Sequence, residues 1–166
     1  RLAAQALLEG HHRDIGVIEL DPNDGEAAPG RRIGCRTYLE QAGIPWSTVH
    51  VAVGHGTTRD GYAAASRLLT DHPWLTGLVC GNDRMALGAY AAIREQGLRV
   101  REDVAVIGID DQELIADQVH PALTTVALPF EEMGQVAVSH LLALMEGEEV
   151  PAETLLPGTI IRRSSA

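Results

Sequence analysis

Short apolar segments recur about every 30 residues through the first two thirds of the chain, and a segment with a helical pattern follows each of them. Crossover connections between parallel strands require this spacing. It predicts strands near residues 15–20, 49–53, 77–81 and 104–109, with helices on both faces of the sheet. The expected fold class is therefore α/β, with a parallel sheet in a Rossmann-like lobe.

Three helices are expected between these strands, over residues 31–42, 59–70 and 85–96. Gly43 and Gly97 close the first and third, since glycine is the preferred residue just past the end of a helix. The connection over residues 21–30 is rich in Asp, Pro, Asn and Gly and is long for a strand-to-helix loop. Its length favours a ligand-facing role.

The last third of the chain changes character. A strand is expected over residues 123–126, a helix over 130–145, and a strand pair over 153–161 that Pro157-Gly158 interrupts. Apolar residues repeat with helical spacing along the helix, at Phe130, Met133, Ala137, Leu141 and Leu144. Such a stripe requires a surface to pack against.

The composition indicates one globular domain and argues against two kinds of partner. The 166 residues are 45% hydrophobic, and the formal net charge of −10 repels polyphosphate, so this chain alone is a poor nucleic-acid binder. No apolar run reaches the roughly 20 residues of a membrane span, and no basic leader precedes one. Residues 1–10 are typical of the middle or end of an amphipathic helix, which predicts a larger protein around this sequence.

The two cysteines indicate whether the protein works in a reducing or an oxidising compartment. Cys35 lies in a helical pattern and Cys80 in a buried strand, which suits free thiols in a reducing environment better than a disulfide framework. A cytoplasmic location is therefore expected.

Polar pairs follow two neighbouring strands. Asn82-Asp83 ends the third strand and Asp110-Asp111 ends the fourth, which is the most apolar of the chain. Either pair can cap the segment after it. Ligands of parallel α/β sheets bind at the carboxyl ends of the strands, so a ligand contact by Asn82 and Asp110 is also expected.

Arg31 and Arg32 stand where the first predicted helix begins. The helix dipole disfavours cations there, so a specific partner is required. Reaching across the strand ends to Asp110, or to hydroxyl groups of a ligand, would supply one, and an Arg side chain offers a bidentate fork for both.

Metal and catalytic patterns do not assemble. His11-His12 has no Cys or carboxylate at ligand spacing, and His55, between two glycines, fits a polar contact better than a general base. Neither the serines nor the cysteines lie in a nucleophile motif, and the chain, which contains no Lys, has no phosphate loop. Neither an enzyme nor a metal or cofactor site is expected.

In family order and spacing, four segments resemble the lactose-repressor family of bacterial transcription regulators: GRRIGCRTYLEQAG (30–43), DGYAAASRLL (60–69), LVCGNDRMALGAYAAIREQGLRVREDVAVIGIDD (78–111) and HPALTTVALPFEEMG (120–134). The resemblance covers nearly the whole chain. It implies a two-lobed effector domain of the type I periplasmic-binding-protein-like fold.

The resemblance also implies a division of the chain. Residues 1–122 match the C-terminal lobe, residues 123–150 a crossover strand and a helix of the N-terminal lobe, and residues 151–166 a return to the C-terminal lobe. The DNA-binding domain is expected to lie outside this sequence. Members form homodimers, and the family's dimer-contact helix matches residues 85–96, with Met85, Leu87 and Tyr90 as expected contacts.

Three positions match effector-binding residues of the family: Arg31, Asn82 and Asp110. In known members an aromatic side chain follows the second strand, where this chain has Gly56, preceded by His55, so His55 is a further candidate contact. The resemblance implies a repressor-type regulator with a small effector, a sugar in the first instance, that controls operator binding. A periplasmic or surface sugar-binding protein of a transport system has the same architecture and is the alternative.

Overall fold

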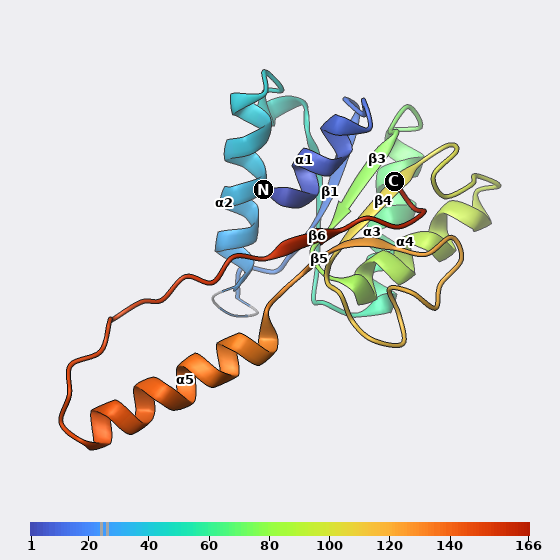
Figure 1. Ribbon diagram of the computed structural model, residues 1–166. Helices are drawn as coiled ribbons and strands as arrows, with labels where there is room; N and C mark the ends of the chain where they lie inside the picture. The colour runs from blue at the N-terminus through green and yellow to red at the C-terminus, as the bar shows by residue number, and fades with distance from the viewer. Residues whose placement is uncertain (24, 26) are drawn as a thin grey trace.

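One six-stranded sheet forms the centre of the molecule in the computed structural model, which describes residues 1–23, 25 and 27–166 (Figure 1). The strand order is β2-β1-β3-β4-β5-β6. The first five strands in this order run parallel and β6 is antiparallel to β5, which confirms the predicted parallel sheet. The strands are β1 (Ile15–Leu20), β2 (His50–Gly54), β3 (Gly77–Cys80), β4 (Ala105–Asp110), β5 (Thr124–Ala127) and β6 (Thr159–Ile161).

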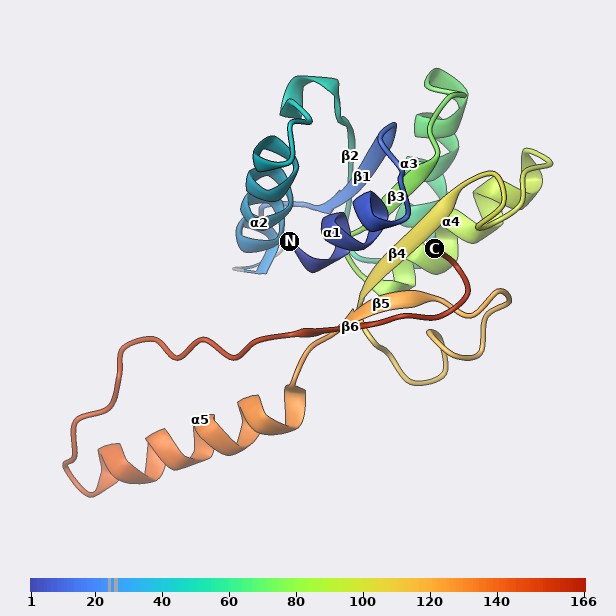
Figure 2. The ribbon, with the colours of Figure 1, turned by 45° about the horizontal axis from the view of Figure 1, so that its top comes forward.

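Alternate residues of the central strands feed two hydrophobic cores, because successive side chains of a strand point to opposite faces. Ile18 and Leu78 lie in one core, with helices α3 (Thr58–Asp71) and α4 (Asp83–Glu95). Val17 and Val79 lie in the other, with α1 (Leu2–Glu9) and α2 (Ala27–Gln41). The expected helices on both faces are therefore confirmed (Figure 2). A short 3-10 helix, η1 (Trp46–Thr48), precedes β2.

Two glycines bring α3 and α4 into close contact. A Cβ atom at Gly61 would lie 2.2 Å from the backbone oxygen of Met85, and one at Gly88 would lie 2.1 Å from that of Thr58. Any larger residue would push the helices apart. The close contact fixes the N-terminus of α4 beside the carboxyl ends of β2 and β3.

The start of α2 corrects the sequence prediction. The helix begins at Ala27 and not at Arg31, so Arg31 and Arg32 lie in its second turn, away from the positive end. Alanine favours a helix, and Pro29 is tolerated in a first turn because the amide it lacks has no helical partner there. The dipole argument for Arg31 was therefore wrong. Of the expected loop at 21–30, Asp24 and Glu26 lie outside the described residues.

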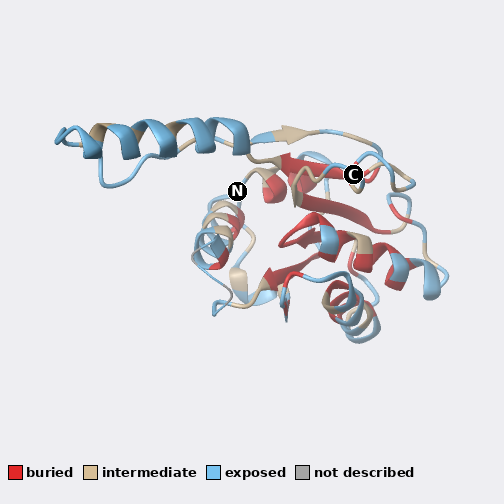
Figure 3. Ribbon diagram, turned by 90° about the horizontal axis from the view of Figure 1, so that it is seen from below, coloured by how far each residue is buried: buried red, intermediate tan, exposed pale blue. Residues whose placement is uncertain are grey.

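The last third of the chain departs from the sheet. The helix α5 (Phe130–Met145) has no buried residue and projects from the body of the molecule. Figure 3 shows this helix apart from the sheet and coloured mostly as exposed. The expected strand pair over residues 153–161 is wrong, because only Thr159–Ile161 pairs, with β5. Residues 153–156 have no neighbouring strand to bond with in this structure.

Two remaining expectations concern cysteines and membranes. Cys35 and Cys80 are free and buried, as predicted, and burial raises the pKa of the Cys35 thiol to about 11. No helix of the described residues combines the length and the apolar character that a membrane crossing requires.

Candidate functional site

Arg31 and Asp110 meet across the carboxyl end of the sheet. Arg31 Nη2 lies 2.8 Å from Asp110 Oδ1, and Arg31 Nη1 donates to the backbone carbonyl of Gly81, which follows β3. The two side chains are 23% and 12% exposed. The prediction that the arginine reaches across the strand ends to Asp110 is confirmed. The pair remains open to solvent on one side, where a polar ligand can exchange hydrogen bonds with both groups.

The backbone at Asp110 is strained. Its φ angle is 117° and that of Asp111 is 54°, a left-handed region that side-chain-bearing residues avoid at a cost of about 1–3 kcal/mol each. Strain of this kind persists only where surrounding contacts hold it, and it is concentrated at ligand sites. One such contact is the ion pair between Asp111 Oδ1 and Arg163 Nη2, 2.7 Å apart.

The environment of Asp110 opposes its ionisation. Partial burial raises the pKa of this carboxyl group, and Arg31 beside it lowers the pKa in part. A carboxylate with little water around it depends on its cation partner. The same property makes it a strong acceptor for ligand hydroxyl groups, which would replace the missing water.

Asn82 is almost fully buried, and both ends of its amide are bonded. Its Oδ1 accepts from the backbone amide of Met85 at 2.8 Å, so it caps α4, and its Nδ2 donates to the carbonyl of Gly56 at 3.0 Å. The capping interpretation is confirmed. A ligand contact by Asn82 stays a prediction, and in this structure Asn82 ties the loop after β2 to the turn after β3.

His55 lies in that loop after β2 and is exposed. Its backbone amide donates to Asp60 Oδ2 at 3.3 Å. The strand order places β2 at the sheet edge, with β1 and β3 between it and β4, the strand of Asp110. A ligand contact by His55 stays a prediction that a large ligand, reaching along the strand ends, would satisfy.

Glu19 on β1 is a buried carboxylate that was not predicted from the sequence. Glu19 is only 6% exposed and Arg32 Nη1 lies 3.4 Å from its Oε2, while its Oε1 has no hydrogen-bond partner among the residues that the structure describes. Burial raises the pKa of Glu19, and Arg32 lowers it in part. Glu19 interrupts the apolar segment IGVIEL, and that interruption was the available signal. It also gives Arg32 a partner on the strand beneath α2.

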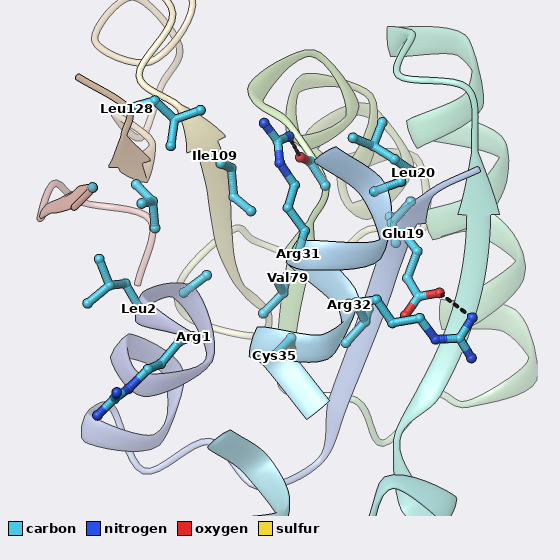
Figure 4. A pocket seen from close by; sticks show the side chains of 17 residues that line it. Arg1, Leu2, Glu19, Leu20, Arg31, Arg32, Cys35, Val79, Ile109 and Leu128 are labelled. Carbon is cyan, nitrogen blue, oxygen red and sulfur yellow. Dashed lines mark hydrogen bonds and ion pairs between the residues drawn. The ribbon is translucent and has the colours of Figure 1, made fainter. Parts of the chain in front are cut away.

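A cavity of about 260 Å³ lies between α1, α2 and the sheet (Figure 4). The charged residues of its lining are Arg1, Glu19, Arg31 and Arg32, and residues such as Val79 and Ile109 supply the apolar part. Few large side chains of α2 pack onto the sheet, since its buried residues are Ala28, Cys35 and Leu39. The helix that carries Arg31 is therefore less tightly packed than α3 and α4 are.

The expected dimer contacts need correction. Met85 is 0% and Tyr90 2% exposed, and both are packed in the core of their own chain, where Tyr90 also donates a hydrogen bond to the carbonyl of Pro121. Neither side chain is available to a partner surface in this structure, because α4 is buried on most of its sides, Met85 lying against α3. Leu87 is partly exposed and remains the one of the three available for such a contact.

Metal ligands do not gather at this edge. Among the residues that the structure describes, no three His, Cys, Asp or Glu side chains are placed to hold an ion together. The polar groups of Arg31 and Asp110 are suited to bind hydroxyl groups.

Known proteins resemble this chain over almost its whole length. Residues 4–166 match the family of periplasmic binding protein-like domains. The HTH-type transcriptional repressor PurR of Yersinia pestis bv. Antiqua (strain Antiqua) is 38% identical over 169 residues, covering 99% of this chain and 48% of that protein. The chain thus spans about half the length of the curated relatives that it matches.

Solved structures give the same result. The transcriptional regulator CelR in complex with cellobiose superimposes with a TM-score of 0.92 at 34% identity, covering 99% of this chain and 50% of the other. A Lac repressor dimer bound to operator and the anti-inducer ONPF gives a TM-score of 0.90 at 32% identity, covering 99% and 56%. These matches confirm the expected fold.

Proposed function

The chain belongs to the family of periplasmic binding protein-like domains, in the form found in regulators of the lactose-repressor family, and from this premise we propose that it senses a small effector for a DNA-binding module. The observation that carries the proposal is the Arg31–Asp110 pair at the carboxyl end of a parallel sheet. The pair is partly buried and open to solvent on one side, and the backbone of Asp110 is strained. This geometry is suited to a polar ligand, because the pair can exchange hydrogen bonds with it.

The proposed effector is a sugar. Arg31 and Asp110 present donors and acceptors side by side, which matches neighbouring hydroxyl groups of a pyranose ring. CelR, a structural neighbour, was solved with cellobiose. The acidic pair and the absence of Lys disfavour a sugar phosphate.

We infer that the chain contributes to two lobes. Residues 1–122 form one lobe, residues 123–150 cross over and contribute α5 to a second lobe, and residues 151–166 return. The exposure of α5 supports this, because a helix with apolar residues on most sides is stable in water only when it is covered. The effector would lie between the lobes, and closure of the lobes would alter the spacing of two DNA-binding modules in a homodimer.

In this proposal Leu87 lies at the homodimer contact, and the protein acts in the cytoplasm, where its free cysteines stay reduced. The relatives are transcription regulators, so the comparisons favour this function over the transport alternative. The net charge of −10 is consistent with DNA contacts made by a separate module.

A ligand screen on the full-length protein tests the proposal. Thermal unfolding is measured with cellobiose, lactose, a panel of monosaccharides and, as a second chemical class, free nucleobases. A ligand that binds only the folded state raises the melting temperature with its concentration. We expect a saturable rise with at least one sugar. A rise with nucleobases alone would refute the sugar assignment, and a sugar that binds equally well to Asp110→Asn would refute the site.

A further inference from the structure

The turn that carries Asp110 does not hold its shape through its own residues. Asp110 and Asp111 both adopt positive φ angles without being glycine, so the turn would relax if it were free. The last register pair between β4 and β5 is Asp110 with Ala127. The amide groups of Asp111 and Gln112 come after this pair, beyond the ladder. Contacts from outside the turn must therefore hold it, and the ion pair between Arg163 and Asp111 is one of them.

Asp83 is bonded to this turn from a different element. It is the first residue of α4 and is 0% exposed. Its Oδ2 accepts from the backbone amide of Gln112 at 2.7 Å, and its Oδ1 accepts from the Thr125 hydroxyl of β5 at 2.6 Å. Gly108 leaves the space for this carboxylate, because a Cβ atom there would lie 2.1 Å from Asp83 Oδ1.

Helix stability does not explain this burial. An acidic residue in the first turn of a helix is favourable while it is exposed, but Asp83 has lost its water, and Asn82 already caps α4. Burying a carboxylate is costly unless strong hydrogen bonds replace its water. The two bonds that do so here lead to the Asp110 turn and to the strand that continues into α5.

We propose that Asp83 is the positioning residue of the effector site: it holds the turn over residues 110–112 so that Asp110 meets Arg31, and through Thr125 it fastens this turn to β5. The link to an effector rests on the proposed function. The positioning itself does not, because it is a property of the protein without ligand.

Hydrogen exchange measured by mass spectrometry on the ligand-free full-length protein tests it. In Asp83→Ala, exchange of a peptide over residues 109–114 should be about tenfold faster, because the Gln112 amide loses its acceptor. Asp83→Asn should restore slow exchange, since its oxygen can accept from Gln112 and its amide can donate to Thr125. Gly108→Ala, whose methyl group displaces the carboxylate, should behave like Asp83→Ala.

Asp103→Ala is the matched control. Asp103 also accepts from a backbone amide, that of Arg99 at 2.8 Å, in the turn before β4. Its loss should speed exchange there and leave residues 109–114 unchanged. Unchanged exchange at 109–114 in folded Asp83→Ala and Gly108→Ala would overturn the proposal, as would a tenfold loss of protection in Asp83→Asn. If Asp83→Ala does not fold, the comparison of Gly108→Ala with Asp83→Asn decides in the same way.

The result is independent of the ligand screen. If no sugar binds but the Asp83 variants behave as expected, the positioning stands and the proposed effector is wrong. If a sugar binds through Asp110 while the exchange is unaffected, the proposed function stands and Asp83 has no positioning role.

Discussion

Asp83 carries a charge that its surroundings do not neutralise. In the part of the chain that the structure describes, a hydroxyl and a backbone amide bond its oxygens, and no arginine forms an ion pair with it. Burial, with a smaller contribution from the charges of Asp110 and Asp111, raises its pKa from 3.8 to about 6 despite the lowering effect of these two bonds. The folded protein thus binds this proton more tightly than the unfolded chain does.

A stability dependence on pH follows from this shift. The contribution of protonated Asp83 is fully present below pH 3.8 and is lost as pH rises through about 6, amounting to about 3 kcal/mol at most. The difference in unfolding free energy between wild type and Asp83→Asn, from urea titrations, should become less favourable to wild type between pH 4 and pH 7. A difference that is constant over this range would contradict the assignment.

Asp103 serves as a control, because its contribution to stability should depend on pH in the opposite direction. Hydrogen bonds from Arg99 lower the pKa of this exposed carboxyl group. Its contribution is present above the unfolded pKa and is lost as pH falls, so Asp103→Asn should show a small change in the other direction.

Some of these residue-level features were predictable from the sequence. Asp110 and Arg31 stand at a strand end and near a helix start, and their charges alone make each a candidate partner for the other. The bond between Asp83 and Thr125 was not predictable, because 42 residues separate the two and their contact depends on how β5 pairs with β4. Glu19 gave a signal in sequence, but its partner on α2 depends on the true start of that helix.

At the scale of elements, the contact between α3 and α4 determines where the N-terminus of α4 lies. At Gly61 and Gly88 the backbones of the two helices are so close that a Cβ atom would overlap the neighbouring backbone. The tight packing of this helix pair contrasts with the cavity beneath α2. The two faces of the sheet therefore differ in how closely their helices are packed, and the Arg31 side contains the cavity.

Gly88→Ala should destabilise the protein by about 1–3 kcal/mol, because the methyl group meets the backbone of α3 and no flexible side chain can yield. Gly30→Ala is the matched control, since Gly30 is also helical and, among the described residues outside its own stretch of helix, no atom lies within 4 Å of its would-be Cβ. The control should be neutral or gain up to about 1 kcal/mol from helix propensity. Equal unfolding midpoints for the two variants in urea would contradict the account.

The helix α5 tests the proposed division into lobes. Leu141 is 58% exposed, although leucine on a helix with this pattern is normally covered. In the full-length protein, Leu141→Gln should lower stability by about 2–5 kcal/mol if a second lobe buries it. Gln135→Ala, on the same helix, should change stability by less than about 0.5 kcal/mol. If Leu141→Gln is equally mild, α5 is not part of a packed lobe.

Strand positions in the sheet were predictable because apolar segments and glycine-rich turns alternate so regularly. The start of α2 was not, because Pro29 and Gly30 suggested a loop that local helix propensity overrode. The failed strand at 153–156 has a different cause. A strand requires a neighbour, and no sequence pattern within this chain states whether one is present.

For the molecule as a whole, the proposed function separates effector sensing from DNA binding. A chain of net charge −10 with its polar site at one edge of a parallel sheet can hold a small ligand but repels DNA. The resemblance predicted the fold of this chain, and the matches to CelR and to the Lac repressor confirm that fold. The effector's identity was not predictable, because in the proposed two-lobed arrangement side chains of both lobes would select it.

Operator binding by the full-length protein tests the central claim most directly. Fluorescence anisotropy of a labelled operator is measured with increasing concentrations of the sugar found in the screen, for wild type, Arg31→Ala and Asp110→Asn. Because the DNA contacts would lie in another module, both variants should bind operator with affinity within about threefold of wild type and should lose their response to the sugar. A normal sugar response in both variants would contradict the claim that the Arg31–Asp110 pair is the effector site.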